Sequence, residues 1–195
     1  MTSILKADNI QDADGNNIIN ESSNTITIGA SGDTITIPSG ATIANSGTAT
    51  GFGESNKPAF YATMGEQSIP DGTYTKLQFG TEVVDTNSAY DNSTNYRFTV
   101  PSGEAGLYYF TAQAQVSGID DNERGQIVFA LNGSNKGESL SRSFSTGADH
   151  TVYATASSVF NLSVSDYVEV YVYQNEGSSR SGGYGQFGGY KVCTV

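Results

Sequence analysis

The chain of 195 residues has room for one domain of ordinary size with an appended segment. It carries 20 Asp plus Glu against nine Lys plus Arg, a net charge of −11 at pH 7, which argues against a nucleic-acid partner and against anionic membranes. With 23 Gly, 12 Tyr, four Pro and no Trp, the composition predicts an all-β, turn-rich protein.

The first segment, residues 1–23, predicts an N-terminal arm. Two apolar pairs, Ile4-Leu5 and Ile18-Ile19, flank the turn sequence DADGNN, so a hairpin and an extended arm both fit. The segment lacks the apolar run that a signal peptide needs, and no stretch of the chain reaches the length of a membrane span. We therefore expect synthesis in the cytoplasm and no membrane insertion.

The next segment, residues 24–57, predicts a β-repeat stalk followed by a hinge. Thr-Ile steps recur about every eight residues between Ser-Gly pairs, which fits one short strand and one turn per step. One thin ribbon cannot bury its isoleucine row, so we expect several copies around a common axis, with a disordered linker as the alternative. The predicted stalk core consists of Ile26, Ile28, Ile35, Ile37 and Ile43.

The remaining chain, residues 58–195, predicts a domain of many short strands with regular turn signals. In LYYFTAQAQV, Tyr108 and every second residue after it face one way, and polar residues alternate with them. In DYVEVYVY, valines that fit a core alternate with a tyrosine column that another subunit could cover. The predicted subunit interface consists of Tyr109, Tyr167, Tyr171, Tyr173 and Tyr190.

Aromatic, glycine and proline landmarks follow a recognisable order in this domain. They include Ala59-Phe60, Tyr90-Asp91, Val100-Pro101, the stretch GLYYF from Gly106, and Phe187-x-Gly189-Tyr190. This order resembles the globular head shared by complement component C-one-q and the tumour necrosis factor superfamily. The resemblance implies a jelly-roll knob that assembles as a homotrimer. The signal peptide and collagen stalk of secreted members are missing, so their immune functions are not carried over.

The opening SILKADNIQDADGNNIIN is similar to the first residues of many structural proteins of tailed bacteriophages. With the predicted stalk and knob, this resemblance implies a virion surface protein assembled in the bacterial cytoplasm. Its arm would dock on a capsid or tail protein, and its knob would contribute to attachment to the host surface. A capsid decoration protein that stabilises the head is the alternative, and a capsule-degrading enzyme is a weaker one. Neither the capsid or tail location nor the receptor follows from the sequence.

Groups that could carry catalysis are sparse. His150 and Cys193 are the only histidine and cysteine, and there is no nucleophile-elbow motif, so we predict no enzyme and no cofactor. The acidic residues Asp120, Asp121 and Glu123 in GIDDNERG predict a solvated loop, with a calcium site as the alternative.

The stretch NEGSSRSGGYGQFGGY, residues 175–190, predicts a glycine-rich loop. Within it, Arg180, Tyr184 and Gln186 are candidate contacts to a receptor such as a host-surface glycan, because tyrosine and arginine make hot-spot contacts. A flexible connection into the last strand is the alternative.

Overall fold

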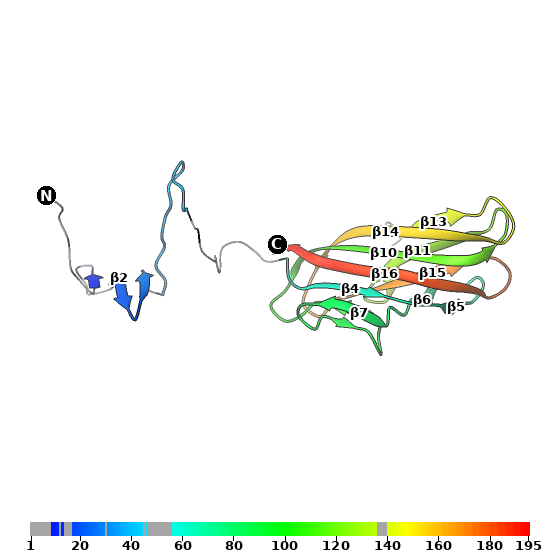
Figure 1. The fold of residues 1–195 in the computed structure, drawn as a ribbon, viewed down its shortest axis with the longest axis horizontal. Coiled ribbons are helices and arrows are strands. Elements are labelled where there is room, and N and C mark those ends of the chain that lie inside the picture. Colours follow the sequence, from blue (N-terminus) through cyan, green and yellow to red (C-terminus); the bar gives the residue numbers. More distant parts are fainter. Residues whose placement is uncertain are drawn as a thin grey trace. The chain divides into compact units, whose positions relative to one another are not determined.

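The computed structural model of the protein describes residues 9–11, 13, 17–29, 31–44, 46, 56–135 and 140–195. The chain divides into two compact units, Met1–Thr50 and Gly51–Val195, which we call the N-terminal unit and the knob (Figure 1). Within the described ranges, no helix is long and apolar enough to cross a membrane. The apolar pair predicted at positions 4 and 5 lies outside the described residues.

The N-terminal unit contains a small antiparallel sheet of β1 (Asn9–Gln11), β2 (Asn17–Ser22) and β3 (Thr25–Ile28), in that order. Ser23 and Asn24 join the last two strands with φ values of 50° and 62°. Two successive positive φ values are those of a type I′ turn, whose twist matches that of the flanking strands. The boundary predicted between arm and stalk therefore falls inside a hairpin turn.

Isoleucines line one face of this small sheet. Ile10 pairs with Ile19, and Ile19 pairs with Ile28, so the three side chains form one cross-strand row that is exposed in the single chain. Only the first Thr-Ile step of the predicted repeat is a strand, since residues 31–44 contain none. A lone segment has no neighbour to take its backbone hydrogen bonds, so one copy cannot form the repeated ladder.

The knob is a sandwich of two antiparallel sheets. Sheet 1 has the order β14 (His150–Leu162), β10 (Gly106–Ile119), β16 (Arg180–Cys193), β4 (Ala59–Thr63) and β7 (Thr81–Asp85), with β5 (Gln67–Ile69) beside β16. Sheet 2 has the order β12 (Ser134–Asn135), β11 (Arg124–Leu131), β15 (Tyr167–Gln174), β9 (Arg97–Thr99) and β8 (Tyr90–Asp91), with β13 (Ser141–Phe144) beside β11 and β6 (Thr75–Lys76) beside β15. Figure 1 shows the long strands running along the knob.

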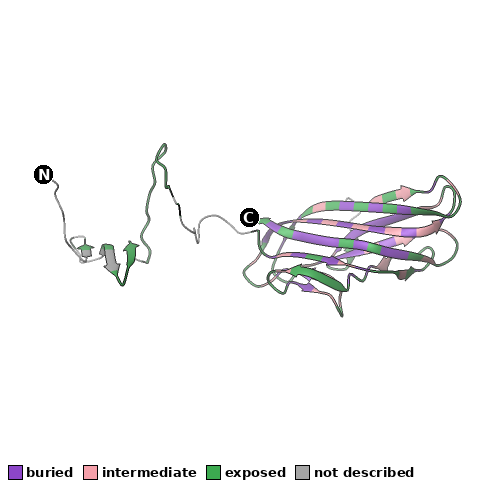
Figure 2. Cartoon of the chain, viewed as in Figure 1, coloured by how far each residue is buried: buried purple, intermediate pink, exposed green. Residues whose placement is uncertain are grey.

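The core lies between the sheets and is rich in aromatic rings. The alternation predicted for β10 is confirmed, because Tyr108, Phe110 and the small residues after them are buried while their neighbours are half-buried. Buried and exposed residues alternate along the long strands in Figure 2. Phe60 stacks on Tyr90 and meets Phe187 edge-on, with ring centroids 4.8 Å apart in both pairs.

The loop predicted over residues 175–190 is wrong for most of its length. Residues 180–193 form β16, a strand near the middle of sheet 1. Its glycines serve close packing rather than flexibility: a Cβ at Gly189 would overlap the ring of Phe110, and a Cβ at Gly183 would overlap the carbonyl of Gly65. Glycine lowers the local propensity to form a strand. In β16, packing against neighbouring strands outweighs that low propensity.

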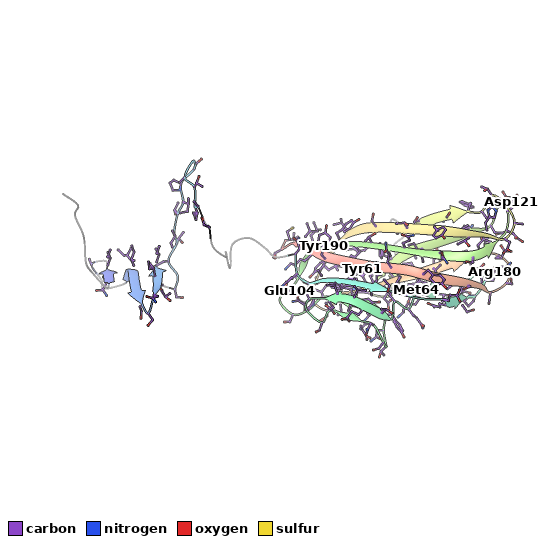
Figure 3. All side chains as sticks on the ribbon, in the orientation of Figure 1. Tyr61, Met64, Glu104, Asp121, Arg180 and Tyr190 are labelled. Atoms are coloured by element: carbon purple, nitrogen blue, oxygen red, sulfur yellow. The ribbon has the colours of Figure 1, made fainter. Side chains whose placement is uncertain are left out.

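The knob has two distinct ends. At the end where the chain enters, Tyr190 pairs with Ala59, and Lys191 N donates to Pro58 O over 3.0 Å. We call this the near end. At the other end, the far end, Arg180 pairs with Ile69. Figure 3 shows Tyr190 and Arg180 at opposite ends of the knob.

Candidate binding surfaces

The predicted interface tyrosines divide between the two sheets. Tyr109 and Tyr190 project outward from sheet 1, with ring centroids 5.7 Å apart. Tyr167, Tyr171 and Tyr173 belong to β15 and project outward from sheet 2, while the valines between them are buried in the core as expected. Because the outer faces of a sandwich point in opposite directions, the five residues do not form one surface.

The β15 tyrosines pack against charged groups of their own chain. The guanidinium carbon of Arg97 lies 4.1 Å from the ring centroid of Tyr167. That of Arg124 lies 5.3 Å from the ring of Tyr173. Cations over tyrosine rings are attracted by the ring quadrupole, so these rings are partly covered from within the chain.

Tyr171, between these two tyrosines on β15, contacts a partly buried ion pair. Lys76 Nζ lies 2.6 Å from Glu169 Oε1, and the Tyr171 hydroxyl donates to Glu169 Oε2 over 3.4 Å. Desolvation by burial, and then the charge of Glu169, raise the pKa of Tyr171. Tyr171 therefore remains a neutral donor that helps to satisfy a buried carboxylate.

The outer face of sheet 1 has a different character, which we call the uncharged face. It comprises the outward positions of the four adjacent strands β14, β10, β16 and β4. These positions are Thr151, Tyr153, Thr155, Ser157, Val159 and Asn161 on β14; Leu107, Tyr109, Thr111, Gln113, Gln115 and Ser117 on β10; Ser181, Tyr184, Gln186, Gly188, Tyr190 and Val192 on β16; and Ala59, Tyr61 and Thr63 on β4. None of them carries an acidic or basic side chain, in a chain with a net charge of −11.

A groove of about 290 Å³ crosses the near half of the uncharged face. Its walls include Tyr61, Tyr109 and Tyr190, and its floor is formed by Gly188 and Gly189. The Tyr61 hydroxyl donates to Gln186 Oε1 over 2.8 Å, which fixes one wall. Gly188 faces outward and has no side chain, which leaves the hollow between the aromatic walls, whereas a Cβ at Gly189 would point into the core toward Phe110.

The candidate receptor contacts lie on β16 or at its start. Gln186 accepts the hydrogen bond from Tyr61 on the uncharged face. Arg180 Nη2 donates to Glu176 Oε1 over 2.7 Å at the far end. Tyr184 is 65% exposed, the most exposed tyrosine among the described residues of the knob. All three therefore belong to β16 and not to the predicted loop.

The acidic residues named for calcium lie at the far end, between β10 and β11. Asp120 Oδ1 accepts a hydrogen bond of 2.9 Å from the backbone of Asp149, and Glu123 accepts one from the side chain of Asn175. Asp121 is exposed. In the part of the chain that the structure describes, no group of three or more His, Cys, Asp or Glu side chains could hold a metal ion.

The structure does not bring the histidine and the cysteine together. His150 begins β14 and pairs with Ile119, whereas Cys193 ends β16 and pairs with Leu107. Twelve residues of β10 separate those two partners, which corresponds to roughly 40 Å along a strand. A catalytic pair of His150 and Cys193 within one chain is therefore excluded by geometry.

Neither the uncharged face nor the Lys76–Glu169 pair was predicted from the sequence. The stretch TVYATASSVFN contains a signal for the uncharged face, because none of the alternate residues that project outward from it is charged. Its extent depends on which strands are neighbours, and that is a property of the long-range topology. The second depends on the pairing of β6 with β15, whose residues are about 90 positions apart along the chain.

The knob belongs by fold to the C1q/TNF-like jelly-roll class. Among solved structures, the chain is similar to the globular domain of zebrafish complement 1qA protein, with a TM-score of 0.53 and 18% identity, covering 71% of this chain and 100% of that one. It is also similar to Eiger TNF from S. frugiperda, with a TM-score of 0.51 and 10% identity, covering 70% and 93%. No protein-family model and no curated protein matches the sequence.

These likenesses show the fold alone. The fold part of the predicted resemblance, an all-β sandwich of two antiparallel sheets, is confirmed. Folds of this class are typically non-catalytic, and their members usually form homotrimers. A fold does not fix a function, which has to be argued from the surfaces described above.

Proposed function

We propose that the chain is a surface protein of a tailed bacteriophage virion, a homotrimeric appendage whose knob projects outward and contributes to host attachment. The uncharged face, apart from Ser181 and Tyr184 toward its far end, carries the trimer. Copies with a net charge of −11 repel one another, and a wide face without charged side chains is where two such copies can approach. Depletion of charge and enrichment in tyrosine are typical of interface cores.

The layout of the uncharged face fits a ring of three. In a cyclic trimer, each copy offers one surface to one neighbour and a different surface to the other. The groove between Tyr61, Tyr109 and Tyr190 lies on one side of the face. On the other side, Tyr153 and Val159 project from the edge strand β14 and are 57% and 51% exposed. These two surfaces are the complementary halves of the proposed interface.

The virion assignment rests on the N-terminal unit. Its opening residues are the stretch from which a phage structural protein is predicted, and its exposed isoleucine row is an apolar surface that a coat or tail protein could cover. The isoleucines at positions 35, 37 and 43 are also exposed in one chain, as expected of a stalk core that needs three copies. Three knobs on one stalk would strengthen attachment through avidity.

The trimer is tested with matched substitutions of two half-buried strand threonines. Thr111→Glu places a charge at the centre of the uncharged face, and Thr99→Glu places one on the outer face of sheet 2. By light scattering, we expect about three times the 20.5 kDa of one chain for the parent protein and for Thr99→Glu, and a monomer for Thr111→Glu. A monomeric parent protein would contradict the proposal.

The virion role is tested by labelling purified particles with an antibody against the knob. Label at the tail supports host adsorption, and label on the capsid supports a head fibre or decoration protein. The stability of particles that lack the protein then distinguishes a head fibre from a decoration protein. If particles carry no label although the antibody detects the free protein, the virion assignment is wrong.

A further inference from the structure

A polar pocket of about 320 Å³ opens at the far end of the knob, where β5 pairs with β16. It is lined by Glu66, Gln67, Ser68, Ser179, Arg180 and Ser181. Its volume is at the lower end of the range for sites that hold a small molecule. Four of these residues belong to the paired strands β5 and β16, and Glu66 and Ser179 directly precede those strands.

The charge balance of the pocket selects against anions. Arg180 is paired with Glu176, whose side chain is only 4% exposed and whose second carboxylate oxygen accepts a hydrogen bond of 2.7 Å from Asp120 N. The positive charge of Arg180 is therefore compensated. Glu66 is exposed and lies beside the pocket, so the remaining charge there is negative. An acidic ligand would be repelled, and a neutral one would not.

The polar groups of the pocket without a partner in the described chain are three serine hydroxyls, one oxygen of the Glu66 carboxylate and the buried Nε of Arg180. Gln67 is engaged within the chain, since its Nε2 donates to Lys76 O over 2.8 Å and its Oε1 accepts from Gln78 N over 3.1 Å. By contrast, the hydroxyls of Ser68, Ser179 and Ser181 make no hydrogen bond within the described residues. Each hydroxyl can donate or accept, and a carboxylate accepts, which suits a ligand that carries several hydroxyl groups of its own.

An aromatic platform lies beside the pocket. The hydroxyl of Tyr184 is 3.4 Å from Glu66 Oε1, and the ring is largely exposed. Tyr184 has a φ of 42° and lies in a bulge, where three residue steps on β16 match two on β10 between Gln113 and Gln115. A bulge changes the direction in which a side chain projects from the sheet. A positive φ in a non-glycine residue also costs conformational free energy.

We propose that the pocket and Tyr184 together bind a neutral saccharide. The apolar C–H face of the sugar ring packs on Tyr184, and its hydroxyls donate to Glu66 and exchange hydrogen bonds with the serines. The pocket lies at the end of the knob opposite to where the chain enters, and Tyr184 lies some six residues or roughly 20 Å along β16 from Tyr190. The inference rests on the proposed attachment role, and it specifies the receptor as an uncharged glycan.

The test uses the full chain and defined probes. The methyl glycosides of glucose, galactose, mannose and N-acetylglucosamine are titrated by saturation-transfer NMR, with glucuronate as the acidic probe. We expect at least one neutral glycoside to bind with an affinity on the order of millimolar, and glucuronate to bind at least about tenfold more weakly. Saturation transfer should be strongest for the sugar protons that lie on one face of the ring.

Substitutions locate the site. Tyr184→Ala should weaken binding at least about tenfold, Tyr184→Phe should retain most of it, and Glu66→Gln should weaken it several-fold. Phe144→Ala is the matched control, because Phe144 is also an exposed aromatic residue, at 56%, on β13 of the other sheet. It should leave binding unchanged.

The outcomes separate this inference from the proposed trimer. Sugar binding that disappears in Tyr184→Ala while the molecular mass is unchanged supports the site, and sugar binding by a monomeric protein would contradict only the trimer. The site is wrong if none of the four neutral glycosides binds at tens of millimolar, if Tyr184→Ala binds as the parent protein does, or if glucuronate binds as well as the neutral probes.

Discussion

Lys76 Nζ lies 2.6 Å from Glu169 Oε1, and the side chain of Glu169 is only 5% exposed. The contact joins the two-residue strand β6 to the central part of sheet 2, where Lys76 pairs with Tyr171. A carboxylate this deeply buried requires a compensating charge, and Lys76 provides it from a segment that is distant in sequence.

Removing only one partner of this pair should destabilise the knob. Lys76→Met leaves the Glu169 carboxylate buried without its cation, and we expect a loss of about 1–3 kcal/mol, less than for a fully buried pair because Lys76 is 32% exposed. Urea unfolding of the single and double variants measures the effect. Adding Glu169→Gln to Lys76→Met should recover much of the loss, and a double variant no more stable than Lys76→Met would contradict the interpretation.

Asp91 should give the knob a stability that depends on acid pH. Hydrogen bonds from the backbone N–H groups of Thr94 and Ser93 lower the pKa of this exposed carboxyl well below its usual range. Because the folded pKa is lowered, the contribution is present above the unfolded pKa of about 4 and is lost as the pH falls below it.

We expect Asp91→Asn to be less stable than the parent protein at about pH 7, by at most about 1 kcal/mol because the group is exposed. The difference should shrink as the pH falls below about 4. Denaturant melts at several pH values measure it. A stability gap that stays constant down to about pH 2 would show that the carboxylate charge is not its cause.

Tyr108 should contribute stability that is lost at high pH. Its side chain is fully buried, its hydroxyl donates to Glu104 O over 2.5 Å, and burial raises its pKa to about 12. A raised folded pKa means that the contribution is complete below the unfolded value of about 10 and declines as the pH rises toward 12.

Tyr108→Phe should therefore be less stable than the parent protein at about pH 8, by on the order of 1 kcal/mol for the lost hydrogen bond. The gap should narrow as the pH rises past about 10, because the phenylalanine variant has no hydroxyl to ionise. Chemical unfolding across this pH range tests the prediction. A gap that widens with pH would count against it.

Gly189→Ala should be among the most damaging small substitutions in the knob. A methyl group at this position would overlap the ring of Phe110 in the core, and overpacking of this kind costs about 1–3 kcal/mol. Gly65→Ala is the control, because a Cβ there meets open space and should change stability by less than about 0.5 kcal/mol. Equal effects of the two variants in thermal melts would show that the overlap is relieved.

The sequence predicted the local patterns well and the long-range ones less well. The period of two in β10 and β15 identified their buried faces, because alternation is imposed by the strand itself. It could not show that Tyr109 and Tyr171 face away from each other, since that depends on which sheet each strand joins. The glycines of β16 were interpreted as a loop because their packing partners, such as Phe110, lie about 80 residues away along the chain.

The position of β16 also has a consequence for biosynthesis. This strand fills the gap between β10 and β4, yet it follows all other described strands of the knob along the chain. Until it leaves the ribosome, β10 and β4 each present an unpaired edge to the cell, and the entire knob depends on one late insertion. Translation that stops before residue 180 would release chains in which β10 and β4 each have an unpaired strand edge. Such truncated products should aggregate rather than assemble.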